Sequence, residues 1–220
     1  MQVYLSPLMA KVHPTSSSSS SSSLYSPLMS SERQVFTIWM KSLVLNGYGC
    51  TIYDSKGLVV YRMDNYDSKS SHEVFFMNSS GKTLFKILKK NVGVFGQWRG
   101  YRSGSGEEGM EVEEKKPWFT AKKVLRIVKR DGKSWGVTVM VGSGNDGDEH
   151  CCYKIHGSYH NKGYKITNFV GDLIAEVKRK ETEKGVVLGE DVLNLVIEPN
   201  SDQMLIMGLV VVCGLTNHSL

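Results

Sequence analysis

The segment that most constrains the fold is an uninterrupted apolar run at residues 204–215 (MLIMGLVVVCGL). A helix that is apolar on every side must be enclosed by lipid or by protein. A bilayer span needs about 20 apolar residues, whereas a twelve-residue helix rises only about 18 Å. Polar residues bound the run, with Gln203 before it and Thr216 after it. We therefore expect a buried core helix and no transmembrane span.

The residues before the run provide a helix start. Pro199 breaks the preceding segment, and Ser201 and Asp202 are two candidate N-caps. The run is longer than the usual strand of about 4–8 residues, but the β-branched residues 210–212 favour a strand, and the pattern alone leaves that alternative open. In the helical interpretation the core positions are Met204, Leu205, Ile206, Met207, Gly208, Leu209, Val211, Val212 and Leu215.

The wall around such a helix is predicted by a repeated turn motif. Asx-x-x-Gly occurs at 54–57, 78–81 and 168–171, each time between two runs rich in β-branched and aromatic residues. Asx side chains bond to nearby backbone and glycine accepts positive φ, so each motif predicts a tight hairpin. Strands are therefore expected on both sides of each motif.

Further strands are predicted at 35–45 (VFTIWMKSLVL), 124–130 (VLRIVKR), 135–141 (WGVTVMV), 151–156 (CCYKIH) and 192–198 (VLNLVIE). The total is about twelve short strands, typical of an antiparallel sandwich or barrel. A closed barrel encloses a central helix on all sides. We expect a mainly β protein, an antiparallel closed barrel around a hydrophobic C-terminal helix, with Gly208 and Gly214 allowing close approach of the strands.

The N-terminal region has a different composition. Eight serines fill residues 16–23, and such a tract cannot bury apolar surface. We expect a disordered Ser-rich tail at 1–31 and a single domain at 32–220. A plastid transit peptide is an alternative interpretation of the acid-poor, Ser-rich tail, although residues 1–31 contain no arginine. Four cysteines without a CxxC motif give no disulfide framework, which favours an intracellular location in cytoplasm, nucleus or membrane periphery.

Four stretches of the sequence resemble the plant LURP-one-related family. They are 36–66 (FTIWMKSLVLNGYGCTIYDSKGLVVYRMDNY), 75–90 (FFMNSSGKTLFKILKK), 116–124 (KPWFTAKKV) and 189–215 (GEDVLNLVIEPNSDQMLIMGLVVVCGL). The resemblance implies a tubby-like fold, a twelve-stranded barrel around a hydrophobic helix, as in tubby-like proteins and phospholipid scramblases. It also implies a loose association with phosphoinositide binding, membrane-tethered transcriptional regulation and plant defence. It supplies no catalytic residues.

The sequence predicts no catalytic, metal-binding or nucleotide-binding site. GxGxxG occurs at 104–109 and 142–147, but neither match leads into a helix that would receive a pyrophosphate. His150, Cys151, Cys152, His156 and His160 are close in sequence without a metal-ligand spacing, and packed hairpin residues are the favoured interpretation. We expect a protein that is not an enzyme and has no cofactor or metal.

Basic residues at strand ends are the candidate binding site. With a net charge of +5 the chain favours anionic partners. Basic side chains near one barrel rim could bind the headgroups of anionic phospholipids, whereas the alternative is that lysines only keep strand edges soluble. The candidate lipid-binding residues are Lys86, Lys89, Lys90, Lys178, Arg179 and Lys180, and a third strand carries Lys122, Lys123, Arg126, Lys129 and Arg130.

The predicted function is a non-enzymatic regulatory module that binds anionic phospholipid at a membrane surface. A scramblase-like lipid-handling protein and a protein-interaction scaffold without lipid binding are the alternatives. Direct nucleic-acid binding is not expected, because no helix-turn-helix, zinc-finger or basic-zipper pattern occurs.

Overall fold

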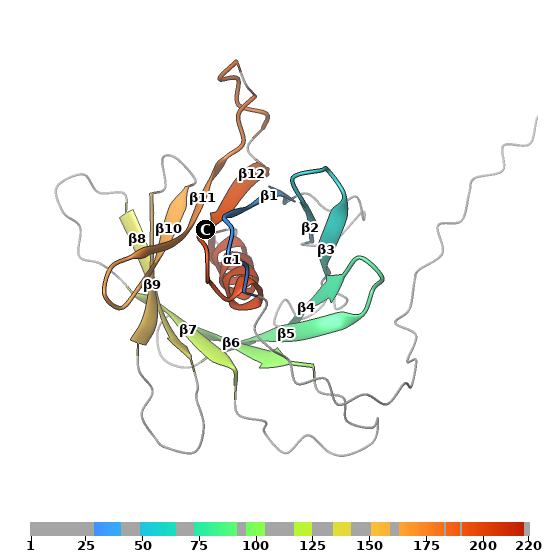
Figure 1. Cartoon of the computed structure of the whole chain (residues 1–220). Helices are drawn as coiled ribbons and strands as arrows, with labels where there is room; N and C mark the ends of the chain where they lie inside the picture. Colours follow the sequence, from blue (N-terminus) through green and yellow to red (C-terminus); the bar gives the residue numbers. More distant parts are fainter. Residues whose placement is uncertain are drawn as a thin grey trace, which may run out of the picture.

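The computed structural model describes residues 29–40, 49–64, 73–91, 96–103, 117–124, 134–141, 151–158, 163–182, 184–189 and 191–217. The described residues form twelve strands and one helix, and Figure 1 shows the strands arranged in a ring around the helix. The strands are β1 (Gln34–Trp39), β2 (Cys50–Tyr53), β3 (Val59–Asp64), β4 (Glu73–Asn78), β5 (Thr83–Lys90), β6 (Gln97–Arg102), β7 (Phe119–Val124), β8 (Ser134–Val141), β9 (Cys151–Ser158), β10 (Tyr164–Asn168), β11 (Leu173–Arg179) and β12 (Val192–Ile197), and the helix is α1 (Gln203–Asn217).

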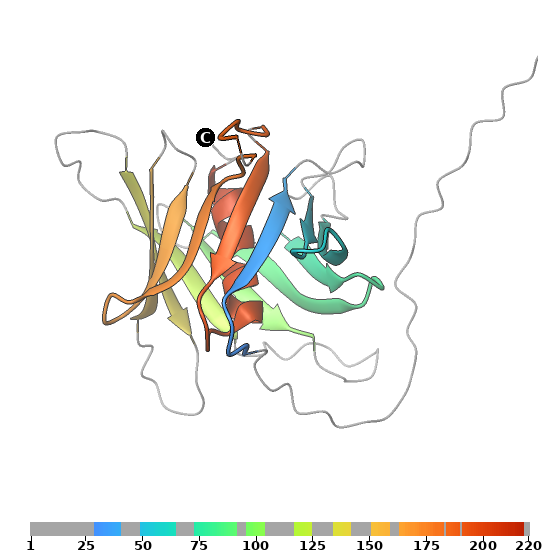
Figure 2. The same ribbon diagram turned by 45° about the horizontal axis from the view of Figure 1, so that its top comes forward.

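The sheet is a closed barrel in which each strand pairs with its neighbours in sequence. The first and last strands close it, with Gln34 opposite Ile197 and Trp39 opposite Val192. Every pair is antiparallel, so all odd-numbered strands end at one rim, which we call the upper rim, and all even-numbered strands end at the lower rim. Figure 2 shows β1 running upward beside the helix. The predicted mainly β, closed antiparallel barrel with a C-terminal helix is confirmed.

The three Asx-x-x-Gly motifs form tight hairpins at the lower rim, as predicted. In each, the Asx side-chain oxygen accepts backbone N–H bonds: Asp54 Oδ1 from Lys56 and Leu58, and Asn168 Oδ1 from Gly171 and Asp172. Asn78 does the same for the turn between β4 and β5. The closing glycines have φ between 80° and 114°, a region that favours glycine.

The apolar run is a helix inside the barrel. Asp202 is its N-cap, since Asp202 Oδ1 accepts from the Leu205 N–H at 3.1 Å. Of the predicted core positions, Leu205 to Leu209, Val211 and Val212 are buried, and only Met204 and Leu215, near the helix ends, are half-buried. A Cβ on Gly208 would lie 3.0 Å from the ring of Phe119, so glycine permits the close approach that the sequence predicted. The β-branched residues 210–212 do not prevent the helix, because a segment whose side chains are buried on all sides by the barrel is more stable as a helix than as an added strand.

Some predicted segments lie wholly or partly outside the described residues. The strand predicted at 35–45 is observed as β1 up to Trp39, and residues 41–45 are outside the described part. The strand predicted at 124–130 overlaps β7 only at Val124, and its other residues are outside the described part, as are the serine tract and both GxGxxG matches. The described chain starts at Met29, which bridges to Asp202, before the predicted domain boundary at residue 32.

Candidate functional site

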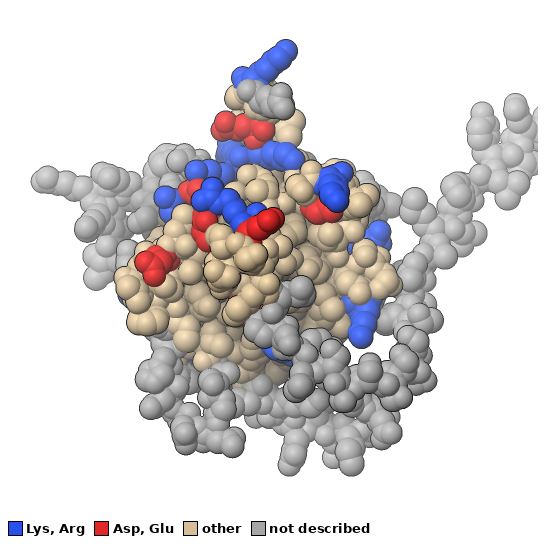
Figure 3. Space-filling model, viewed as in Figure 1, with Lys and Arg blue, Asp and Glu red and all other residues tan. Residues whose placement is uncertain are grey.

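The candidate site is an open groove on the barrel wall formed by β9, β10, β11 and β12. Its volume is about 890 Å³, and it carries four cationic and two acidic side chains. Figure 3 shows blue and red side chains gathered over this part of the barrel. The lining residues are His156, Gly157, Gly163, Tyr164, Lys165, Glu176, Val177, Lys178, Arg179, Lys180, Glu181 and Asn194.

Strand register places the polar residues of the groove side by side. Lys165 on β10 is opposite His156 on β9 and Glu176 on β11. Lys178 on β11 is opposite Asn194 on β12. Side chains alternate between the two faces of a strand, and the buried Val177 between Glu176 and Lys178 identifies the lumen face. These polar side chains therefore share the outer face of the barrel.

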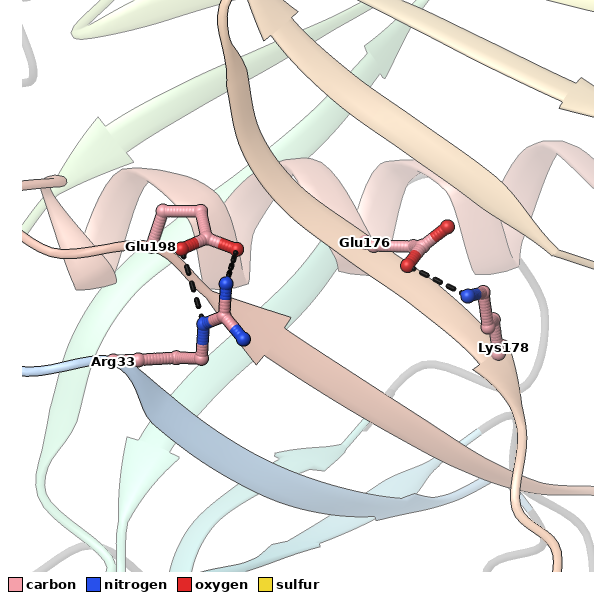
Figure 4. A network of polar contacts seen from close by, with 4 residues as sticks. All are labelled: Arg33, Glu176, Lys178 and Glu198. Atoms are coloured by element: carbon pink, nitrogen blue, oxygen red, sulfur yellow. Dashed lines mark hydrogen bonds and ion pairs between the residues drawn. The ribbon is translucent and has the colours of Figure 1, made fainter.

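Glu176 holds two of the lysines. It forms an ion pair with Lys178 (Figure 4), in which Glu176 Oε2 lies 2.8 Å from Lys178 Nζ. Glu176 Oε1 lies 3.5 Å from Lys165 Nζ. The hydrogen bond from Lys178 and the charges of both lysines lower the pKa of Glu176, against the effect of partial burial. Both lysines are mostly exposed. One carboxylate thus pairs with two ammonium groups and neutralises only one of their charges. The groove therefore keeps a net positive charge near neutral pH.

The upper end of the groove is formed by Arg179 and Lys180. Lys180 Nζ donates to Thr37 Oγ1 at 2.6 Å, which fixes its long side chain across β12 toward β1. Arg179 has the same parity on β11 as the buried Val177, so it faces the lumen side at the upper rim and is half-buried. All three residues of the second predicted basic set, 178–180, are among the residues that line the groove.

The first predicted basic set lies elsewhere. Lys86, Lys89 and Lys90 belong to β5, and five strands separate β5 from β11 in either direction around the barrel. Lys86 pairs with Glu73 at 3.2 Å, and Lys89 Nζ lies 5.6 Å from the ring centre of Trp98. Both sets occupy the upper half of the barrel, but they are on opposite walls and do not form one pocket.

The third basic strand is described only in part. Lys122 and Lys123 are on β7, with Lys122 exposed and Lys123 half-buried. Arg126, Lys129 and Arg130 are outside the described residues. β7 is separated from the groove by β8, so Lys122 and Lys123 do not line it.

Three groove residues were missed by the sequence analysis as binding residues. Lys165 follows Tyr164 in an alternating run, so its outward direction could have been predicted, but its position beside Lys178 depends on strand register. His156 was interpreted as a packed hairpin residue, with metal binding as the alternative, and Asn194 was not considered. Within the described residues no three His, Cys, Asp or Glu side chains gather closely enough to hold a metal ion.

The fold and groove define a class of protein: a closed antiparallel barrel filled by its own helix, with a charged groove on the outer wall. The sequence pattern of the LURP-one-related family matches residues 34–214. The chain belongs to this family.

Relatives in Arabidopsis thaliana support this assignment. The chain is 43% identical over 198 residues to Protein LURP-one-related 3, and this alignment covers 88% of this chain and 84% of the relative. It is 41% identical over 211 residues to Protein LURP-one-related 11, covering 95% and 89%. The fold is similar to an X-ray structure of an Arabidopsis thaliana protein, with a TM-score of 0.58 and 17% identity over 84% of this chain and 91% of the other.

In the described part of the chain, no helix combines the length and the apolar character that crossing a bilayer requires.

Proposed function

We propose that the protein is a non-catalytic regulatory module that binds anionic phospholipid headgroups, phosphoinositides in particular, through the groove on β9–β12. The observation that carries the proposal is the convergence of Lys165, Lys178, Arg179 and Lys180 on one open groove. Its volume is within the range of small-molecule sites, about 300–1,000 Å³, and suits a phosphorylated inositol ring. Each lysine or arginine near an anionic membrane contributes about 1 kcal/mol to binding.

Glu176 gives the groove selectivity for multiply charged ligands. A headgroup phosphate that reaches Lys165 and Lys178 competes with the carboxylate that already holds them. A single weak anion gains little from that exchange, because the lysines lose one charge-assisted partner as they gain another. A headgroup with several phosphates also reaches Lys180 at the upper end of the groove, so we expect affinity to rise with phosphate number.

The interior of the barrel supports a non-catalytic role. The helix occupies the lumen with mainly apolar side chains that pack against the strands, so the space in which other barrels bind a substrate is filled. The described lining of the outer groove holds no serine, threonine or cysteine that could serve as a nucleophile. These features favour recognition over catalysis.

The same burial separates this proposal from a scramblase-like activity. Lipid transport by residues 204–215 requires them to face the bilayer, but nearly all of them are enclosed by strands. A regulatory role in plant defence agrees with the family resemblance, and membrane recruitment is the step that we assign to this domain.

The test is flotation with vesicles that carry phosphatidylinositol bisphosphate in a phosphatidylcholine background. We expect wild-type protein to float, and the double variant Lys178→Glu/Lys180→Glu to bind about thirtyfold more weakly or worse. Lys56→Glu/Lys82→Glu has the same change in net charge on exposed turns of the lower rim and should retain binding. An arm with soluble inositol phosphates as competitors distinguishes a headgroup site from general attraction to the membrane.

Absence of flotation by wild-type protein, or equal losses in both charge-reversed variants, would overturn the proposal.

A further inference from the structure

The hairpin between β11 and β12, described at residues 180–182 and 184–188, presents three consecutive aliphatic side chains to solvent. Val186 is 62% exposed, Val187 43% and Leu188 51%. None of the three belongs to the core cluster or packs against it. Clustered apolar exposure of this kind gains nothing for the folded monomer, which makes it a candidate interaction site.

The hairpin is held together without these side chains. The Thr182 N–H donates to the Val186 carbonyl at 2.8 Å, the Gly185 N–H to the Thr182 carbonyl at 2.9 Å and the Leu188 N–H to the Lys180 carbonyl at 2.9 Å. Thr182 Oγ1 also accepts from the Val186 N–H. These backbone groups are already paired, so the tip can leave water without leaving them unsatisfied.

The hairpin continues directly from the cationic groove. Lys178, Arg179, Lys180 and Glu181 line the groove, and the chain then enters the hairpin, where Lys184 is exposed. Figure 3 shows charged side chains on the projecting hairpin as well as on the wall beside it, and Figure 2 shows the hairpin at the upper rim. Aliphatic side chains next to lysines are the arrangement by which peripheral proteins enter the membrane interface.

The occupant of this surface is a lipid bilayer and not a protein pocket. The groove beside it has a net positive charge, which complements an anionic leaflet, and Lys180 and Glu181 at the base of the hairpin line that groove. The exposed Glu181 weakens the electrostatic attraction to an anionic leaflet. Burial of apolar area in the bilayer contributes to binding independently of charge. The two contributions therefore have different salt dependence.

We infer that Val186, Val187 and Leu188 insert into the interfacial region of the bilayer while the adjoining groove holds a headgroup. The inference rests on the proposed lipid binding and adds the element that enters the membrane and the direction in which the barrel faces it. The upper rim points to the bilayer and the lower rim points away from it.

The experiment compares two sets of exposed apolar residues. Val186→Ser/Val187→Ser/Leu188→Ser removes the hairpin's aliphatic surface, and Phe169→Ser/Val170→Ser is the matched control at the lower rim, where these residues are 72% and 68% exposed. We expect the triple variant to bind phosphoinositide vesicles about tenfold more weakly, with the salt dependence of binding unchanged. The control should bind as wild type, and thermal unfolding of both variants should match wild type.

A second measurement reports insertion directly. Val187→Trp introduces an indole at the tip, and vesicles made with brominated acyl chains quench tryptophans that enter the bilayer. We expect quenching beyond that of wild-type protein, whose own tryptophans provide the baseline.

Three outcomes separate the claims. If wild-type protein binds no anionic vesicles, both the proposed function and this inference are wrong. If wild type binds and Lys178→Glu/Lys180→Glu weakens binding, but the triple serine variant binds as wild type without extra quenching of Val187→Trp, lipid binding stands and insertion is overturned. If the lower-rim control loses affinity instead, the barrel faces the membrane with its other end, which also overturns the inference.

Discussion

The lumen and the outer groove of this barrel are built from the same strands but have opposite character, the lumen being apolar and the groove charged. Along β11, Ala175 and Val177 face a lumen filled by α1, while Glu176 and Lys178 face outward into the groove. The inner face is closed and apolar, and its two thiols, Cys50 and Cys213, are fully buried. The outer face is open and charged. One strand thus contributes alternately to the apolar core and to the charged outer surface on which the proposed recognition depends.

The difference shows where this domain can act. Single-domain barrels often place ligands in their interior, but here the helix occupies that space. The proposed binding therefore falls on the outer wall and the rims, where we expect substitutions to change affinity with little effect on folding. The following predictions test that division, starting with the largest expected effect.

A charge inside the lumen should prevent folding. Leu209→Asp places a carboxylate where the side chain is completely buried among apolar groups, at a cost of about 5 kcal/mol or more. Val35→Asp, on the partly exposed outer side of β1, should remain folded. Circular dichroism and thermal unfolding distinguish them, and a well-folded Leu209→Asp protein would contradict an enclosed helix.

The lumen thiols should resist modification. Burial raises the pKa of Cys50 to about 12 and that of Cys213 higher still. In a Cys151→Ser/Cys152→Ser background, alkylation of the remaining thiols should be slowed on the order of a thousandfold relative to unfolded protein. The measurement is labelling followed by mass spectrometry at pH 8 with and without denaturant. Rapid labelling of the native protein would mean that the lumen is open.

The lower end of the helix should contribute a modest amount of stability. Asp202 caps α1 and its Oδ2 lies 3.5 Å from Arg102, whose guanidinium stacks 4.2 Å from the ring centre of Trp118. Asp202→Ala should lower the free energy of unfolding by about 1 kcal/mol. Arg33→Ala removes the surface ion pair with Glu198 seen in Figure 4 and should change it by about 0.5 kcal/mol or less. Urea unfolding measures both, and equal effects would remove the distinction between a cap and a surface pair.

The smallest effect concerns the ionisation of the groove. The pKa of Glu176 is lowered in the folded state, so its contribution to stability is present above the unfolded pKa and is lost as the pH falls through the folded pKa. Lys178→Met should raise the pKa of Glu176 toward its ordinary value, whereas Lys82→Met, on a distant turn, should not. Carbon-13 NMR of the carboxyl group during an acid titration measures it, and an unchanged pKa would show that Lys178 does not hold Glu176.

The sequence was sufficient to predict the barrel because its signals are local. The Asx-x-x-Gly turns fix the hairpins through contacts within four residues, and the apolar helix carries its own requirement for a wall. The choice of helix over strand at 210–212 could not be made from β-branched residues alone, since enclosure by the barrel decides it.

The groove was predictable only in part because it depends on register. Glu176, Lys178 and Lys180 alternate along the sequence, and the period of a strand puts their side chains on one face without any knowledge of register. However, Lys165 comes beside Glu176 through pairing of β10 with β11, and nothing local to Lys165 indicates that partner. The same lack of register information made residues 86–90 and 178–180 look equivalent, although they occupy opposite walls.

The closure of the barrel has a consequence for biosynthesis. β1 lacks one of its two neighbours until β12 has been made, since Gln34 must wait for Ile197. The helix α1, which fills the lumen, follows β12 in the chain. A nascent polypeptide still on the ribosome therefore carries an unsealed sheet with two free edges and an empty centre, the kind of species that aggregates readily. Closure of the sheet therefore waits for β12, and chaperones that shield sheet edges should assist this step.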